Sequence, residues 1–294
     1  MFVQTNSVKA IRSYFKEKLA LTFSDNEIKL IGNEVICSRL NLSREDLIGV
    51  NDLLLSESDL LYFRSIVKRL LKNEPFQYIT ETAYFYELKL KCDKRALIPR
   101  PETEELVDWV KESFLNKTTP ELIADICTGS GCIALSLKSI YLKSIVIATD
   151  ISNDALSLSR ENSEHTNLNI ELINFSALDE LSYFEKGNFI PNSFDCWVSN
   201  PPYIPIVEKN EMALNVLDHE PHIALFVPDD EALIFYEKIA KMAKIYLKPE
   251  GLLFFEIHEN LSLEVLEILE DLNFNSIEIK LDLQGKTRMV KAKK

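Results

Sequence analysis

The chain has 294 residues, of which 46% are hydrophobic and 27% are charged. This composition predicts well-formed hydrophobic cores rather than disorder, in one large domain or in two domains of ordinary size. The 46 acidic residues outnumber the 33 basic residues and give a net charge of −13. Free nucleic acid is therefore a disfavoured partner, because a phosphate backbone binds basic surfaces.

No apolar run approaches the roughly 20 residues that a membrane span needs, and the first residues lack the apolar core of a signal peptide. We therefore expect a cytoplasmic protein without a membrane partner. The five cysteines contain no C-x-x-C pair, and the four histidines form no cluster along the sequence. We therefore expect the cysteines to be reduced, buried thiols, and we expect no metal site.

Residues 1–75 are predicted to form a small helical domain. Ser56 and Asp59 resemble a helix-start box, apolar residues then recur at helical spacing, and Pro75 follows the run. The next segment, residues 76–97, is rich in aromatic residues and alternates at Leu88 and Leu90. This pattern predicts a β-hairpin linker.

From Ile98 to the end, apolar strand patterns alternate with amphipathic helix patterns. The expected strands are 122–127, 145–149, 170–174, 194–199 and 251–257, and the expected helices are 102–115, 131–141, 153–165, 229–247 and 260–271. Alternating runs on either side of Gln284-Gly285 predict a final antiparallel pair. The pattern indicates a doubly wound α/β domain over residues 98–294, with a mostly parallel, seven-stranded sheet.

The stretch "LIADICTGSGCIALSL" contains a strand, a loop with Gly129 and Gly131, and a helix. Such glycines let the backbone approach a ligand, and Asp150 at the end of the next strand is suited to accept hydrogen bonds from ribose hydroxyls. The dinucleotide fingerprint would need a glycine at Ala134, so a cofactor with an amino-acid tail fits better than one with a pyrophosphate. Asp125 would receive an ammonium group or orient the loop. The alternative is a turn whose glycines are only structural.

The stretch "SFDCWVSNPPYIP" turns from an apolar strand into Asn200-Pro201-Pro202-Tyr203. The Asn200 side-chain oxygen and the Pro201 carbonyl can accept both hydrogen bonds of one planar NH₂ group, and Tyr203 offers a face for stacking. This arrangement suits the transfer of an electrophilic methyl group to an amide or aromatic amine. The alternative is again a simple turn.

Together these motifs resemble the peptide chain release factor N5-glutamine methyltransferases. The quoted matches are "IPRPETEELV" (98–107), "DICTGSG" (125–131), "ATD" (148–150), "VSNPPYI" (198–204) and "EPHIAL" (220–225). Two positions depart from the family pattern. Cys127 stands where the family commonly has a glycine, and Ser176 and Ala177 stand where it commonly has an acid near the adenine.

The resemblance implies a methyltransferase that uses S-adenosylmethionine to modify the glutamine of the Gly-Gly-Gln motif in class 1 release factors, with the helical domain docking that substrate. It implies that Asn200, Pro201 and Tyr203 are catalytic, and that these residues and Pro202 bind the substrate. It places Thr103 and Glu104 toward the cofactor. The implied cofactor-binding residues are Asp125, Cys127, Thr128, Gly129, Ser130, Gly131, Asp150, Ala177 and Asn200.

Two other functions compete with this interpretation. The Asn-Pro-Pro-Tyr sequence alone is shared with adenine-N6 DNA methyltransferases, but those enzymes need a basic recognition region, and the sequence shows no long Lys/Arg run. A non-catalytic protein that binds translation factors is the second alternative. Cys127 favours it, and the intact Asn200-Pro201-Pro202-Tyr203 argues against it.

Overall fold

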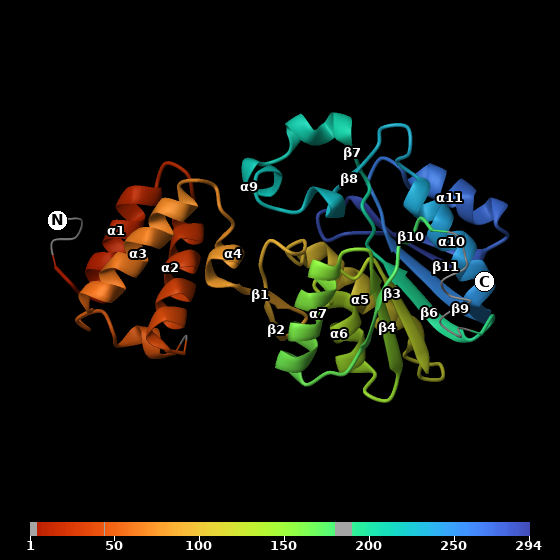
Figure 1. The fold of residues 1–294 in the computed structure, drawn as a ribbon, viewed down its shortest axis with the longest axis horizontal. Helices are drawn as coiled ribbons and strands as arrows, with labels where there is room; N and C mark the ends of the chain where they lie inside the picture. The colour runs from red at the N-terminus through yellow and green to blue at the C-terminus, as the bar shows by residue number, and fades with distance from the viewer. Residues whose placement is uncertain (1–4, 44, 180–189) are drawn as a thin grey trace. The chain divides into compact units, whose positions relative to one another are not determined.

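The computed structural model describes residues 5–43, 45–179 and 190–294 (Figure 1). Residues 1–4 and 44 of the expected helical domain lie outside the described residues. The described chain divides into two compact units, one made of residues up to Glu81 together with Ala213–His219, and the other made of Thr82–Met212 and Glu220–Lys294. None of the described helices is long and apolar enough to cross a membrane.

The first unit is helical, as expected. Its elements are α1 (Val8–Leu19), α2 (Asp25–Leu40), the 3-10 helix η1 (Asp46–Ile48), α3 (Glu57–Leu70), α4 (Phe76–Thr80) and α9 (Leu214–Leu217). Ser24 with Glu27 and Ser56 with Asp59 form capping boxes that satisfy the first N–H groups of α2 and α3. The apolar faces of α1, α2 and α3 bury one common core, in which Phe15 and Phe63 meet edge to face.

The segment after Pro75 differs from the expected hairpin. Pro75 precedes α4 as its N-cap instead of ending helical structure, since its fixed φ suits the first turn of a helix. The hairpin is confirmed further along the chain, in β1 (Thr82–Phe85) and β2 (Leu88–Lys91). Its two turn residues, Tyr86 and Glu87, both have positive φ, which is the backbone that a two-residue hairpin turn requires.

The second unit contains a seven-stranded sheet whose strand order is β10-β11-β9-β6-β3-β4-β5. The strands are β3 (Leu122–Ile126), β4 (Ile145–Asp150), β5 (Glu171–Asn174), β6 (Phe194–Ser199), β9 (Leu247–Glu256), β10 (Asn275–Leu281) and β11 (Thr287–Lys293). All neighbouring strands are parallel except β11, which is antiparallel to both β9 and β10. The expected parallel sheet with a final antiparallel pair is confirmed.

Helices cover both faces of this sheet (Figure 1). They are α5 (Pro101–Phe114), α6 (Cys132–Ile140) and α7 (Asn153–Thr166) on one face, and α10 (Ile234–Tyr246) and α11 (Ser262–Asp271) on the other. Successive residues of β6 alternate between the two cores, with Cys196 and Val198 in one and Trp197 in the other. A strand buried on both sides reads as a continuous apolar run, which is why the sequence showed it clearly.

The chain order places a topological switch point between β3 and β6. From β3 the chain continues to β4 on one side, and it returns later to β6 on the other side. The loops that leave β3 and β6 diverge there, and open α/β sheets bind ligands in the crevice outside such strand ends. The glycine loop after β3 and the Asn-Pro-Pro-Tyr motif after β6 therefore lie together at the carboxyl ends of the parallel strands. The short β7 (Ile204–Pro205) and β8 (Phe226–Val227) pair with each other beyond these strand ends.

Candidate functional site

The loop after β3 has an unusual backbone, since Cys127, Gly129 and Gly131 all have positive φ, at 64°, 57° and 82°. At Gly131 a Cβ would lie 2.4 Å from Ser159 Oγ, so glycine is required there for space as well as for conformation. At Cys127 the same backbone is adopted by a residue with a side chain, which costs about 1 kcal/mol. Burial raises the pKa of the Cys127 thiol, which therefore stays neutral.

The end of β4 holds this loop in place. The Thr128 N–H donates to the carbonyl of Thr149 at 2.8 Å, and the Gly129 N–H donates to Asp150 Oδ2 at 2.9 Å. Asp150 also accepts the Ser152 N–H through Oδ1 at 2.9 Å. Burial raises the pKa of Asp150, and these N–H donors oppose that rise. The aspartate that was predicted to bind ribose thus also fixes the loop.

Asp125 is fully buried beneath the loop. Its Oδ2 accepts the Thr128 hydroxyl at 2.6 Å and the Ala134 N–H of α6 at 3.1 Å, whereas its Oδ1 is buried without a hydrogen-bond partner among the described residues. Burial raises its pKa to about 7. Asp125 was expected either to receive an ammonium group or to orient the loop. Its hydrogen bonds match the second role, and Asp125 is not among the residues that line the pocket described next.

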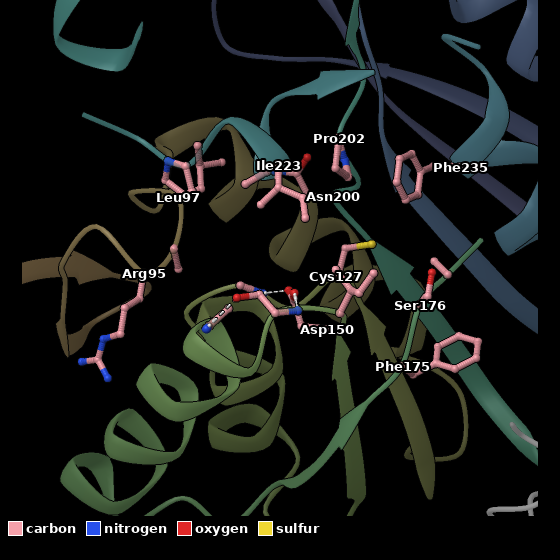
Figure 2. Close-up of a pocket in the computed structure, with 18 of the residues that line it drawn as sticks. Arg95, Leu97, Cys127, Asp150, Phe175, Ser176, Asn200, Pro202, Ile223 and Phe235 are labelled. Atoms are coloured by element: carbon pink, nitrogen blue, oxygen red, sulfur yellow. Dashed lines mark hydrogen bonds between the residues drawn. The ribbon is translucent and has the colours of Figure 1, made fainter. Parts of the chain in front are cut away.

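A pocket opens over these strand ends (Figure 2). Six of the site residues predicted from the sequence line it, namely Cys127, Gly129, Asp150, Ala177, Asn200 and Pro202. Much of the remaining lining is apolar and was missed: Ala96, Leu97, Ile151, Ala155, Phe175, Leu178, Pro221, Ile223, Ala224 and Phe235. Arg95 borders the pocket, but in Figure 2 its guanidinium points away, and it pairs with Asp93 and Glu161.

Part of the missed wall, at 96–97 and 221–224, comes from two segments that one ion pair joins. Glu220 is buried, and its carboxylate accepts the Arg100 guanidinium at 2.6 Å and the Ile98 N–H at 3.0 Å. This tie holds the segment before α5 against the segment that begins at Pro221. The segments "IPRPE" and "EPHIAL" are both family matches, and they carry opposite charges, at Arg100 and Glu220. Those two charges were the sequence signal that could have predicted a contact between the segments.

The residues of the Asn-Pro-Pro-Tyr motif do not all face the pocket. Asn200 and Pro202 line it, whereas Pro201 and Tyr203 are not among its lining residues. Asn200 Nδ2 donates to Thr103 Oγ1 at 3.2 Å, and within the described residues its Oδ1 accepts no hydrogen bond. The Tyr203 hydroxyl donates to Glu256 at 3.1 Å. Substrate stacking by Tyr203 therefore stays a prediction.

Several other expected cofactor residues act beside the pocket rather than in its wall. Thr128 and Gly131 shape the loop, and the Ser130 carbonyl accepts the Asn162 side-chain N–H at 3.0 Å. Glu104 accepts the Tyr86 N–H of the hairpin at 2.9 Å, and Thr103 is buried against Asn200. Thr103 and Glu104 are not among the residues that line this pocket, so their place toward the cofactor stays a prediction.

Family models match both units. The model described as "PrmC N-terminal domain" matches residues 24–80, and the model described as "Methyltransferase small domain" matches residues 107–220. The chain is 38% identical to a release factor glutamine methyltransferase from Flavobacterium psychrophilum, over 97% of this chain and 98% of that protein. The chain belongs to the release factor glutamine methyltransferases. A member from Bacteroides thetaiotaomicron is 36% identical over 96% of this chain and 98% of its own length.

Solved methyltransferase structures share the fold over most of the chain. A methyltransferase from Pyrococcus furiosus has a TM-score of 0.51 and 18% identity, and the match covers 77% of this chain and 96% of that chain. A 16S rRNA methyltransferase from T. thermophilus, in complex with AdoMet and guanosine, has a TM-score of 0.50 and 16% identity, over 72% and 49% of the two chains. These structures confirm the expected fold class, and the family models and relatives make the protein an S-adenosylmethionine-dependent methyltransferase.

The pocket suits this cofactor. Its apolar wall, which includes Ile151 and Leu178, can cover an adenine ring, and the Asp150 carboxylate can accept ribose hydroxyls. Gly129 leaves the floor open, because an added Cβ there would meet only Ala96, at 3.9 Å. Among the described residues that line the pocket, Ser176 and Ala177 stand where the family commonly has an acid near the adenine.

Replacing Asp150 by alanine tests the cofactor site. Asp150→Ala should weaken binding of S-adenosylmethionine by about 1–3 kcal/mol, because charge-assisted hydrogen bonds to the ribose and the tie to the loop are both lost. Isothermal titration calorimetry measures the change. The control is Asp154→Ala, which removes an exposed acid from the first turn of α7. Equal affinities of the two variants would contradict the assignment.

The raised pKa of Asp125 predicts a pH dependence of stability. An unfolded aspartate titrates near pH 4, so between about pH 4 and about pH 7 the folded protein holds more protons at Asp125 than the unfolded chain does. The contribution of Asp125 to the free energy of unfolding therefore falls as pH rises through this window. Relative to Asp125→Asn, the cofactor-free wild type should lose on the order of 2 kcal/mol between about pH 5 and about pH 8. Urea unfolding measures this difference, and parallel pH profiles would refute the prediction.

Proposed function

We propose that this protein methylates the side-chain amide nitrogen of the glutamine in the Gly-Gly-Gln motif of a class 1 release factor. The single observation that carries the proposal is the state of Asn200 in the pocket wall. Its Nδ2 is held by Thr103, while its Oδ1 accepts no hydrogen bond from the described residues. An acceptor that is fixed but unused is what a primary amide substrate requires. The names of the relatives support the same substrate.

The chemistry follows from the properties of a primary amide. Its nitrogen is a poor nucleophile, because its lone pair is delocalised into the carbonyl group. S-adenosylmethionine supplies a methyl group on a positively charged sulfur. Asn200 Oδ1 and the Pro201 carbonyl would each accept one N–H, which orients the nitrogen and stabilises the positive charge that develops on it. The buried Pro201 and Pro202 limit the access of water to this nitrogen.

A methylation assay tests the proposed substrate. The protein is incubated with labelled S-adenosylmethionine and either a class 1 release factor or an adenine-containing DNA duplex, and the modified residue is mapped by mass spectrometry. Label on the Gly-Gly-Gln glutamine is expected. Label on DNA alone would favour the adenine methyltransferase alternative. Tight binding of the release factor without any label would favour the non-catalytic alternative.

Asn200→Ala should reduce kcat/KM for the release factor on the order of a hundredfold or more, since an orienting and electrostatic contact in the transition state is lost. The affinity for S-adenosylmethionine should change little, because the loop after β3 and Asp150 hold most of that ligand. Steady-state kinetics and calorimetry on the same preparation measure both effects. A folded Asn200→Ala protein with near wild-type kcat/KM would remove Asn200 from the mechanism.

The helical unit is proposed to dock the release factor, which is far larger than one glutamine. A groove in this unit lies between α2, the end of α3, α4 and α9, and its lining includes Phe23, Leu30, Pro75, Phe76 and Leu214. Leu30 and Leu214 are both about half exposed, at 49% and 57%. Exposed apolar side chains around a groove suit a protein partner. Release factors work in translation, so the proposed activity is cytoplasmic.

Leu30→Gln tests this docking without removing any part of the fold. We expect KM for the intact release factor to rise on the order of fivefold, with kcat unchanged, because apolar contact area is lost while the reacting groups stay in place. Leu263→Gln is the matched control, since Leu263 is an exposed leucine (69%) on α11 of the methyltransferase unit. If the two variants have the same KM, the groove does not dock the substrate.

A further inference from the structure

Glu256 is a buried carboxylate that no predicted cofactor or substrate role uses. It ends β9 and is only 3% exposed. Three hydroxyl groups converge on this residue. Thr103 of α5 donates to Oε2 at 2.6 Å, Tyr203 donates to Oε1 at 3.1 Å, and Tyr236 donates to the backbone carbonyl at 3.3 Å. The carboxylate thus joins the start of α5 to the residue that ends the Asn-Pro-Pro-Tyr motif.

The directions of these hydrogen bonds are constrained. An ionised carboxylate can only accept hydrogen bonds, so the Thr103 hydroxyl must donate its one proton to the hydrogen bond with Glu256. The Thr103 oxygen can then only accept from its remaining neighbour, Asn200. Asn200 must therefore turn its Nδ2 toward Thr103, at 3.2 Å, and its Oδ1 away from it. The chain of hydrogen bonds decides between the two amide orientations, which have nearly the same shape.

We propose that Thr103 and Glu256 are positioning residues that fix the orientation of the Asn200 amide, so that an acceptor rather than a donor meets the substrate. This inference rests on the proposed function, because an acceptor at that point matters only for a substrate that brings an N–H. In the flipped orientation Asn200 would present its own NH₂ to the substrate NH₂. Two donors would then face each other, and the nitrogen lone pair would lose its alignment.

The surroundings of Glu256 contain groups that raise its pKa and groups that lower it, and burial is the largest of these effects. Burial raises the pKa of its carboxyl, and Glu102 adds to that rise. Hydrogen bonds from Thr103 and Tyr203 and the positive charge of Arg288 oppose it and stabilise the ionised form. Arg288 is itself held by Asp282 at 3.4 Å and by Glu259 at 3.8 Å.

The kinetic test removes the hydroxyl of Thr103 and keeps its shape. Thr103→Val should lower kcat for the release factor by about tenfold to a hundredfold, as expected for a misaligned reacting group, while the affinity for S-adenosylmethionine is unchanged. Thr103→Ser restores the hydroxyl and should recover most of kcat. The control is Ser193→Ala, because the Ser193 hydroxyl is also buried without a hydrogen-bond partner among the described residues, and Ser193 precedes β6 and does not line the pocket.

A double-mutant cycle tests whether Glu256 acts through Thr103. Glu256→Met removes both acceptors without adding a donor, which frees the Thr103 proton to bond Asn200 Oδ1 and flip the amide. It should lower kcat on the wild-type background and cause little further loss on the Thr103→Val background. Additive losses would show that Glu256 does not act through Thr103.

A third measurement needs no substrate. In protein labelled with ¹⁵N-asparagine, the Asn200 side-chain amide signal is assigned by its loss in Asn200→Ala, and its exchange with water is followed. Exchange should be about fivefold faster or more in Thr103→Val, and unchanged in Thr103→Ser and Ser193→Ala. Unchanged exchange and kcat in Thr103→Val would overturn the inference. If the wild type methylates no release factor, the proposed function fails, while this comparison still decides the orientation of Asn200.

Discussion

The site depends on a constraint at the end of β3, where the chain must leave a buried strand and turn sharply into α6. Three residues with positive φ in five positions make the turn possible, and the backbone N–H groups of this segment need fixed acceptors. The Thr149 carbonyl accepts the Thr128 N–H, and Asp150 accepts the Gly129 N–H. Asp125 accepts the Thr128 hydroxyl and the Ala134 N–H at the start of α6. The Thr149 carbonyl and Asp150 lie at the end of β4, whereas the loop follows β3. The loop that forms the pocket floor therefore keeps its shape only while β3 and β4 are paired in the parallel sheet.

The part of the site that follows β6 is also fixed by a hydrogen bond to the end of a neighbouring strand, in this case β3. Ser199, the last residue of β6, donates its hydroxyl to the Ile126 carbonyl at 2.6 Å and so joins the ends of β3 and β6. Asn200 follows at once, and its amide is held by Thr103. The groups assigned to cofactor and substrate therefore lie on adjacent strands, with little freedom between them, as alignment of two reactants requires.

The sequence predicted those parts of the molecule that local patterns encode. The β6 bounds were correct, because an apolar run ended by prolines is distinctive, and the loop and Asp150 were found from their spacing. Helix α10 begins at Ile234 and not at 229, and α4 was missed, since short or irregular starts carry little periodicity. The contact from Thr103 to Glu256 spans 153 positions and depends on the strand order, so no local pattern could reveal it. Apolar wall residues such as Leu97 and Ile223 look the same in sequence as any buried residue.

Residues 213–219 interrupt the methyltransferase unit: the chain leaves that unit, contributes this excursion to the helical unit and then returns. The chain passes between them three times, after Glu81, after Met212 and after His219, so the helical unit is not an appendage joined at one point. Within that unit, His219 bonds the Lys72 carbonyl at 3.1 Å. The next residue, Glu220, begins the segment that closes the pocket. A chain shortened to begin at Thr82 would still carry α9 but would lack the rest of the helical unit on which α9 packs, so removing the first 81 residues does not remove that unit cleanly.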